Sequence, residues 1–459
     1  MKKITIKLLT LLLAVVLVAS SLSSCLDSIA PLPDREDISS NISASLEEDK
    51  KNFDRASKYY VFWQLPGFDA DKMTYIEDIF ESVYNYEDGL PDTLTHAAAS
   101  ANYFLENFYD GIDLRDEVAV TDALITSYVE VLDDPYAIYR VPEENDDYTL
   151  DMSGKFGGIG VTILYDDENQ TVTVDSINVD SPAEKAGFRV GDMIYAVDGR
   201  LVSDIGYRNA VNYVRGDVGS TVTITVIRDG ERVTLTATRA IVDDISVQCE
   251  ITAEGYGYIR VSSFKDNTYS QFAKAIEEVK AAAVTGVIFD MRNNPGGYLD
   301  TVCDMLSYII PSGKTIVTYE YAGNLFHEKK SKEDTNPLTN KKGDFTLDVP
   351  MVVICNQYTA SAAEIFTAAI RDYRDEGMLS ATVVGTTTYK KGIMQGTYIY
   401  KKDGSSVTLT TAYYNPPCGE NYHGEGVAPD VTVENTATED LQYNRALLEL
   451  QMLINVNNN

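Results

Sequence analysis

The glycine cluster Gly154-Lys-Phe-Gly-Gly-Ile-Gly160 marks the sharpest change of pattern along this 459-residue chain. Upstream of it, over residues 41–140, apolar side chains recur at helical spacing, as at Ile76, Phe80 and Val83. Downstream, apolar and polar residues alternate as in short strands, and beyond residue 245 strand patterns alternate with helical ones. These three patterns predict a multidomain α/β protein with about three domains.

The composition is that of ordinary globular protein, with 44% hydrophobic and 24% charged residues. The formal net charge is −32, which argues against a nucleic-acid partner because phosphates would be repelled. The acidic excess instead indicates a solvated surface.

The first 24 residues have the pattern of an export signal. Lysines precede a mostly apolar run at 8–19, and small residues follow it. The phrase Leu22-Ser-Ser-Cys25 resembles the lipobox of bacterial lipoproteins. That resemblance implies that Cys25 is lipidated and holds the exported protein in the bacterial cell envelope, in the periplasm or on the outer surface. Residues 25–40 then form a tether, and the alternatives are a plain signal peptide or an uncleaved anchor.

The ends of the folded part carry little chemistry. Residues 41–140 are expected to form three or four helices, and residues 436–459 a C-terminal helix and tail. The aromatic side chains of the helical region are expected in a core or in an interface between copies. The helical region is therefore our candidate for homo-oligomer formation.

Residues 154–240 predict a β-rich domain, with a hairpin about Asp229-Gly230. The phrases Phe156-Gly-Gly-Ile-Gly-Val161 and Ser181-Pro-Ala-Glu-Lys-Ala-Gly187 resemble a PDZ domain of the bacterial protease type. A glycine-rich turn can offer backbone N–H groups to a peptide carboxylate, and the adjoining strand edge can pair with the peptide. The resemblance implies that a polypeptide C-terminus binds at Gly157, Gly158, Ile159 and Gly160. The alternative is an ordinary glycine-containing β-turn.

Residues 245–435 predict an α/β core with a partly parallel sheet. Strand Met351–Cys355 runs into Thr359-Ala-Ser-Ala-Ala-Glu364, so Ser361 opens a predicted helix. A hydroxyl there is exposed beside free backbone N–H groups, and small neighbours let a substrate backbone approach. Ser361 is a candidate nucleophile, although a helix start chosen for tight packing would look similar.

A serine nucleophile needs a base. Of the three histidines, only His423 lies in a glycine-bearing loop of the predicted core, whereas His96 is in the helical region and His327 in a lysine-rich loop. The sequence around Ser361 is not Gly-x-Ser-x-Gly, and no lysine lies three residues after it. The other candidate is Lys391, which can accept a proton if burial keeps its amine neutral.

The remaining cysteines are Cys249, Cys303, Cys355 and Cys418. Their wide spacing is unlike a zinc site or a dense disulfide framework. Cys303 and Cys355 are expected to be buried free thiols, and one disulfide stays open for an exported protein.

Four phrases then occur in order: Arg292-Asn-Asn-Pro-Gly-Gly297, the Ser361 phrase, Thr388-Tyr-Lys-Lys-Gly-Ile-Met-Gln395 and Gly424-Glu-Gly-Val-Ala-Pro-Asp430. Together they resemble the carboxyl-terminal processing (tail-specific) proteases of the S41 peptidase family. The resemblance covers nearly everything after about residue 115, including Leu132-Asp-Asp-Pro-Tyr136 and the PDZ insert. It implies an N-terminal helical region, an inserted PDZ domain and a peptidase core of the ClpP/crotonase-like type.

The resemblance also assigns roles. It implies that Ser361 is the nucleophile and Lys391 the general base, with Gln395 hydrogen-bonded to that lysine and orienting it. The backbone N–H groups of Gly297 and Ala362 would form the oxyanion hole, where each donor is worth about 3–4 kcal/mol.

Two further residues bear on this site. The family's Phe-Gly before the lysine is here Tyr389-Lys390, so a second lysine adjoins the base and would depress its pKa if the two amines were close. Glu364 stands at the third helical position, where a carboxylate is expected to cap the helix rather than to catalyse.

The sequence therefore predicts a serine endopeptidase with a Ser–Lys dyad, whose PDZ domain captures polypeptides with apolar C-termini. The resemblance calls for no metal, nucleotide or other cofactor. The expected partners are polypeptide substrates, the membrane through Cys25 and other copies of the chain. The alternative function is a catalytically silent, PDZ-bearing peptide-binding lipoprotein, and a non-proteolytic acyl hydrolase is a third.

Overall fold

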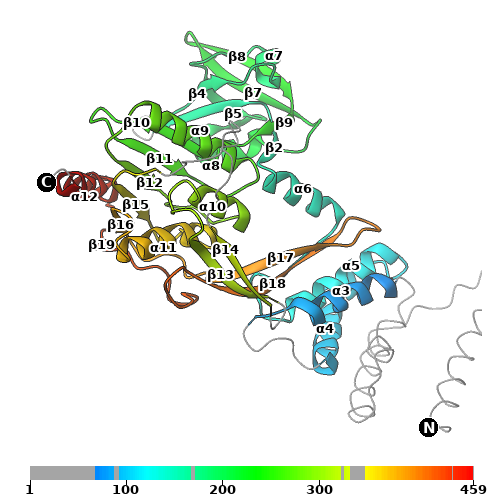
Figure 1. The fold of residues 1–459 in the computed structure, drawn as a ribbon. Coiled ribbons are helices and arrows are strands. Elements are labelled where there is room, and N and C mark those ends of the chain that lie inside the picture. The colour runs from blue at the N-terminus through cyan, green and yellow to red at the C-terminus, as the bar shows by residue number, and fades with distance from the viewer. Residues whose placement is uncertain are drawn as a thin grey trace, which may run out of the picture. The chain divides into compact units, whose positions relative to one another are not determined.

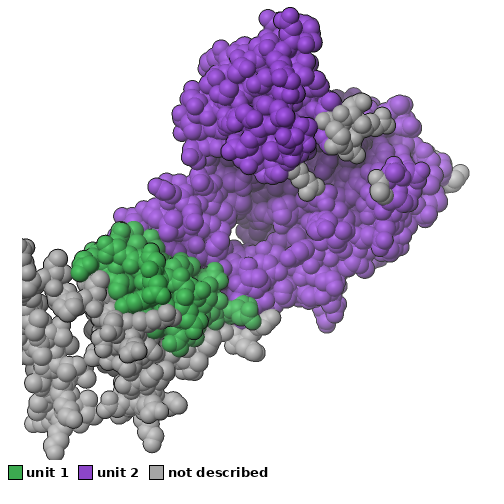
Figure 2. Space-filling model, turned by 180° about the vertical axis from the view of Figure 1, so that it is seen from behind, with its two compact units in different colours: residues 1–76, 91–133 green, residues 77–90, 134–459 purple. Residues whose placement is uncertain are grey.

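The computed structural model describes residues 68–86, 93–166, 171–321, 325–330, 347–436 and 438–457. The predicted export signal, Cys25 and the tether lie outside the described residues. The chain divides into two compact units, which Figure 2 colours separately. The described part of the first comprises residues 68–76 and 93–133, and the second takes in the rest. Within the described ranges, no helix is both long enough and apolar enough to span a bilayer.

The first unit is helical, as the sequence predicts. Its helices include α4 (Thr93–Asn107) and α5 (Glu117–Glu130), and α3 (Ala70–Val83) begins in it. Asp116 caps α5 by accepting a hydrogen bond from the Ala119 backbone N–H. Lys72 and Asp122 form a buried ion pair at 2.7 Å, and such a pair is costly to break on one side only.

The β-rich domain lies in the second unit. Its strands and helices are β2 (Lys155–Gly158), β3 (Val161–Asp166), β4 (Thr171–Ile177), α7 (Pro182–Ala186), β5 (Met193–Val197), β6 (Arg200–Leu201), α8 (Val202–Val214), β7 (Thr221–Arg228), β8 (Glu231–Thr238) and β9 (Ala240–Asp243). The main sheet has the order β3-β4-β5-β7-β8, and β2 pairs separately with β9. The predicted hairpin is the β7–β8 pair, with Asp229 and Gly230 both at positive φ.

Both ends of this β-rich domain are held by one short segment of the core. The Lys265 amine binds Asp151 at 2.6 Å, in α6 (Pro142–Met152), and Asp244 at 2.9 Å. The Asn267 side-chain amide donates to the backbone carbonyls of Gly154 and Asp244. The entry and exit of the domain are thus bound to the same place.

The α/β core is built on a six-stranded sheet of order β10-β11-β12-β15-β16-β19 (Figure 1). Its strands are β10 (Val247–Ile251), β11 (Gly257–Val261), β12 (Val287–Asp290), β15 (Met351–Cys355), β16 (Ala381–Gly385) and β19 (Val431–Thr432). From β11 to β19 the pairing is parallel. Strands β12 and β15 are buried throughout, as expected for a parallel sheet covered on both faces.

Helices cover both faces of this sheet. On one face, the apolar residues of α9 (Thr268–Ala281), α10 (Leu299–Leu306) and α11 (Ala362–Asp375) join Val287 and Phe289 in the main core. On the other, α12 (Leu441–Asn457) packs Ala446 and Leu450 against Ile288. Alternate residues of β12 therefore point to opposite helical layers.

A second sheet has the order β1-β18-β13-β14, with β17 also paired to β18. Its strands are β1 (Ile138–Arg140), β13 (Thr315–Tyr321), β14 (Leu325–Lys330), β17 (Ile393–Ile399) and β18 (Ser406–Asn415). Residues 138–140 pair with β18 and so belong to this sheet, although the sequence pattern assigned them to the helical region. That assignment was wrong because three residues are too few for an alternating pattern to reveal a strand. Cys303 and Cys355 are buried free thiols, as predicted.

Candidate active site

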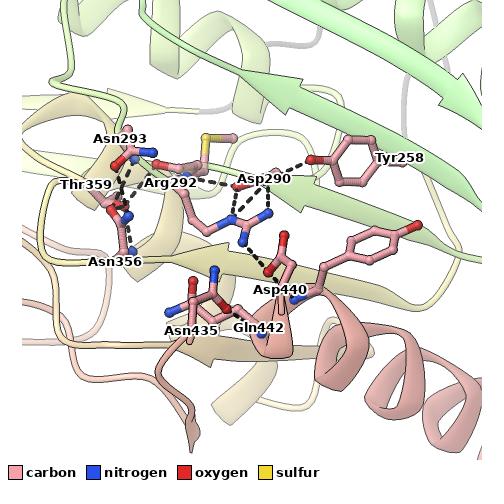
Figure 3. Close-up of polar contacts among 11 residues, drawn as sticks. Tyr258, Asp290, Arg292, Asn293, Asn356, Thr359, Asn435, Asp440 and Gln442 are labelled. Carbon is pink, nitrogen blue, oxygen red and sulfur yellow. Dashed lines mark hydrogen bonds and ion pairs between the residues drawn. The ribbon is translucent and has the colours of Figure 1, made fainter. Parts of the chain in front are cut away.

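The loops that follow β12 and β15 are bound to each other. Thr359 Oγ1 donates to the Met291 carbonyl at 2.9 Å. The Asn356 side chain accepts from the Asn293 backbone N–H at 3.1 Å and donates to Asn293 Oδ1 at 3.0 Å (Figure 3). Because β12 and β15 are parallel neighbours, their carboxyl ends meet at one sheet edge, where α/β proteins place their sites.

Ser361 lies at this edge, at the start of α11. Its backbone has φ 55° and ψ −119°, which few non-glycine residues adopt and which is typical of strained functional turns. Gly296, at φ 102°, packs so closely that a Cβ on it would lie 2.8 Å from Ser361 Cβ. The glycine turn after β12 therefore lies directly against the serine.

The predicted oxyanion donors have free backbone N–H groups. Within the described ranges, neither Gly297 nor Ala362 donates a backbone hydrogen bond. The Phe264 backbone N–H donates to the Gly296 carbonyl, and the Tyr298 N–H donates to the Phe264 carbonyl, so these bonds flank Gly297 without using its N–H. A Cβ at Gly297 would lie 2.1 Å from the Phe264 carbonyl oxygen. Ala362 is the first residue of α11, where N–H groups lack helical partners. Their role stays a prediction, but both donors are available.

Glu364 joins the serine segment to the lysine segment. Its carboxylate is fully buried and accepts from the Ser361 backbone N–H at 2.8 Å, so the predicted cap is confirmed. The same carboxylate accepts from the backbone N–H groups of Lys390 at 2.8 Å and Lys391 at 2.9 Å, and from the Thr388 hydroxyl. One acidic side chain therefore fixes both chain segments of the proposed dyad.

The Lys391 amine lies in a sheltered environment. Its Nζ is 4.5 Å from the centre of the Tyr136 ring. Burial lowers the pKa of this amine from 10.5 to about 8, against the opposing charges of Glu364 and Asp134. Lys390 is exposed and does not contribute to the shift, so burial rather than like-charge repulsion explains it.

Gln395 lies on β17, beside a β-bulge. Its side-chain amide donates to the Thr410 hydroxyl at 3.4 Å, a long hydrogen bond. Among the described residues no hydrogen bond joins Gln395 to Lys391, so the orienting role inferred from the resemblance stays a prediction.

Tyr414, on β18, contacts both members of the dyad. Its hydroxyl donates to the Lys391 carbonyl at 2.5 Å, and the nearby Ser361 side chain acts to lower its pKa. Burial raises the pKa of Tyr414, so it stays a neutral donor and acceptor. Sequence reasoning missed this residue, and its place in an apolar strand gave no signal.

His423, the histidine considered as a base from the sequence, accepts a hydrogen bond beside Lys391. Its Nδ1 accepts a hydrogen bond from the Gly392 backbone N–H at 3.3 Å. A Cβ at Gly392 would lie 2.7 Å from the His423 backbone nitrogen, so glycine is required beside Lys391.

A buried ion-pair cluster adjoins the same sheet edge (Figure 3). Asp290, 1% exposed, binds the Arg292 guanidinium through contacts as short as 2.6 Å and accepts from the Tyr258 hydroxyl at 2.6 Å. Arg292 also binds Asp440, just before α12, at 2.6 Å. Burial opposes the charge of Arg292, but the hydrogen bonds to both carboxylates outweigh it and raise its pKa.

The glycine turn of the β-rich domain leaves a strand edge open. Gly157 and Gly158 pair with β9, while Ile159 is buried and Gly160 turns at φ 77° into β3. Strand β3 pairs only with β4, so within the described residues its other edge is unpaired. That arrangement suits strand addition, and peptide binding at these four residues stays a prediction. The described residues contain no cluster of three or more side chains placed to hold a metal ion.

Comparison with known proteins supplies the family. Residues 255–433 match peptidase family S41, and residues 157–238 match the PDZ domain. The chain is 31% identical over 312 residues to the carboxy-terminal-processing protease of Bartonella bacilliformis, covering 67% of this chain and 68% of that protein.

Two further similarities agree with this result. The "Probable CtpA-like serine protease" of Staphylococcus haemolyticus is 32% identical over 314 residues, which cover 68% of this chain but only 60% of that protein's length. The crystal structure of a Bacteroides fragilis protein described as an S41 protease shares the fold, with a TM-score of 0.51 at 16% identity, over 83% of this chain and 97% of that one.

Proposed function

We propose that this chain, which belongs to the carboxy-terminal-processing proteases of peptidase family S41 and carries a PDZ domain, is a serine endopeptidase acting through Ser361 and Lys391. The observation that carries the proposal is the shared carboxylate of Glu364. It fixes the backbone of a strained serine and that of a buried lysine whose amine has a pKa of about 8.

The reaction follows from these groups. The neutral Lys391 amine removes the proton of the Ser361 hydroxyl as its oxygen attacks the peptide carbonyl. The negative charge on the carbonyl oxygen would be stabilised by the Gly297 and Ala362 N–H groups. The ammonium of Lys391 then returns the proton to the leaving amine. Water, deprotonated by the same amine, hydrolyses the acyl-enzyme.

The substrate and location extend the proposal. The free edge of β3 and the turn at Gly160 support capture of a polypeptide's C-terminal strand, and the apolar surroundings favour an apolar end. The Cys25 lipobox supports anchoring in the cell envelope. A Cys25→Ser variant is expected to lose the membrane association of the full chain on cell fractionation.

The test uses the full chain purified in detergent and an unfolded protein with an apolar C-terminus. We expect cleavage by the parent, none by Ser361→Ala or Lys391→Ala, and full activity in Lys390→Ala, a matched loss of an adjacent exposed lysine. The same substrate ending in two aspartates is expected to be cut more slowly. Cleavage by the Ser361→Ala variant would contradict the proposed Ser361–Lys391 dyad. Binding of the substrate tail by the parent without cleavage would support the catalytically silent alternative.

A further inference from the structure

We propose that Asp134 and Tyr136, which lie upstream of the PDZ domain in sequence, are positioning residues of the catalytic centre. Tyr136 covers the Lys391 amine, and the buried carboxyl group of Asp134 fixes the backbone of Tyr136. The inference rests on the proposed function, because it assigns these residues to the base of that reaction. Both residues lie in Leu132-Asp-Asp-Pro-Tyr136, which is part of the family resemblance but separate from the serine and lysine phrases.

Tyr136 closes one side of the amine. The 4.5 Å separation between Lys391 Nζ and the ring centre leaves no room for water between them. An aromatic face also attracts a cation, so the ring restrains where the ammonium sits once it forms. The Tyr136 ring is itself held, edge-on to that of Tyr86 at 6.3 Å.

Asp134 is a buried acid without a paired base. It is 7% exposed, and its Oδ1 accepts from the Tyr136 backbone N–H at 2.8 Å, which fixes the segment. Its Oδ2 is buried and has no hydrogen-bond partner among the described residues. No ion pair reaches Asp134 within the part of the chain that is described, yet its charge acts on Lys391. Burial without an ion pair disfavours the charged form and raises the pKa of Asp134.

Groups on several elements face Lys391 and set its protonation. They are Glu364 at the start of α11, Asp134 and Tyr136 before β1, and Tyr414 on β18, whose hydroxyl bonds to the Lys391 carbonyl. The two carboxylates favour the ammonium, whereas burial favours the amine. Removing the ring and removing the Asp134 charge should therefore have opposite effects on Lys391.

The experiment measures the midpoint of Lys391 titration in the full chain. Acetic anhydride labelling across pH, read by mass spectrometry, reports the amine directly, and the pH profile of kcat/KM reports it through activity. The variants are Tyr136→Ala, Tyr136→Phe and Asp134→Asn. Asp133→Asn is the matched control, because Asp133 is adjacent and exposed and asparagine tolerates its φ of 55°.

In Tyr136→Ala, water reaches the amine, and we expect the midpoint to rise by about one pH unit. In Asp134→Asn, loss of the opposite charge should lower the midpoint by a similar amount. Tyr136→Phe should restore the parent midpoint, and Asp133→Asn should not move it. Thermal unfolding and PDZ-tail binding confirm that each variant is folded.

A merely structural segment would behave differently. If folded Tyr136→Ala and Asp134→Asn reduce activity while both labelling midpoints stay at the parent value, or if both move in the same direction, the inference is overturned. If the parent does not cleave at all, the proposed function is what has failed, and the labelling midpoints still decide the inference.

Discussion

Two buried cations near one sheet edge have opposite surroundings. The Arg292 guanidinium is paired directly with Asp290 and Asp440, which hold it in the charged form. Among the described residues, no carboxylate is in ion-pair contact with the Lys391 amine, and a ring covers it, so its pKa falls to about 8. Burial alone thus does not decide whether a basic side chain stabilises or reacts. Direct pairing decides it.

The largest expected effect is on activity, when Lys391 is replaced. Lys391→Met should lower kcat/KM by about 10²–10⁴-fold, because the base is lost. Its free energy of unfolding should stay equal or rise at pH 7, because a poorly compensated buried cation is removed. Steady-state kinetics and chemical denaturation measure the two quantities. A large loss of stability in this variant would contradict the contrast with Arg292.

The next largest effect is on stability, when Arg292 is replaced. Arg292→Met leaves Asp290 buried without its partner, and the free energy of unfolding should fall by about 3–5 kcal/mol. Adding Asp290→Asn should recover much of the loss, since the uncompensated charge is then gone. Denaturant titrations of both variants supply the values, and equal stability of the single and double variants would show that the pair is not energetically coupled.

Glu364→Gln tests the link between the serine and lysine segments. The amide keeps only one acceptor oxygen, so either the Lys390 N–H, or the N–H groups of both Ser361 and Lys391, are left facing another donor. We expect a loss of stability of about 1–3 kcal/mol and a reduced kcat. Thermal unfolding measures the loss of stability, and steady-state kinetics measure kcat. The matched control is Glu376→Gln, at the C-cap of α11.

The pH dependence sharpens the comparison further. With the Lys391 pKa near 8, kcat/KM should rise with pH and level off above that value, falling about tenfold per unit below it. The native amine titrates below its unfolded value of 10.5, so the unfolded state binds more protons between pH 8 and 10.5. Stability from this group therefore increases with pH across that window. The stability gap between the parent and Lys391→Met should narrow there, and a constant gap would argue for an ordinary exposed lysine.

The smallest effect concerns Lys390. Its backbone has φ 84°, a left-handed conformation that costs a non-glycine residue about 1–2 kcal/mol. Lys390→Gly, which restores the family's residue, should therefore stabilise the protein, less the entropy cost of glycine in the unfolded chain. Activity should be unchanged, since the Lys390 side chain is exposed. Differential scanning calorimetry of this variant beside Lys401→Gly separates the backbone effect from the loss of charge.

Much of the site could be predicted because its parts are local in sequence. Ser361 follows a recognisable strand, and Glu364 stands one turn into the helix that the serine opens. The α/β core and the PDZ domain likewise follow from patterns within short windows. The lipid anchor at Cys25 and the orienting role of Gln395 stay predictions.

Other features depend on tertiary contacts that no window contains. The contact between Tyr136 and Lys391 joins positions more than 250 residues apart in sequence. The strand that follows Tyr136, β1, has too few residues to be predicted from its pattern. The Arg292–Asp440 pair joins a loop to a distant helix. Burial of the Lys391 amine is itself a property of packing, so its lowered pKa could not be read from a lysine beside a glycine.

Glu364 recognises the base-bearing segment largely through main-chain N–H groups, at positions 390 and 391. That recognition does not depend on which side chains those two positions carry. The exposed residues Tyr389 and Lys390 are consequently free to drift in evolution while the dyad stays assembled. Substitutions at these two exposed positions can therefore change the surface beside the dyad from apolar to cationic, and with it the substrate preference, while the buried contacts of Glu364 stay the same.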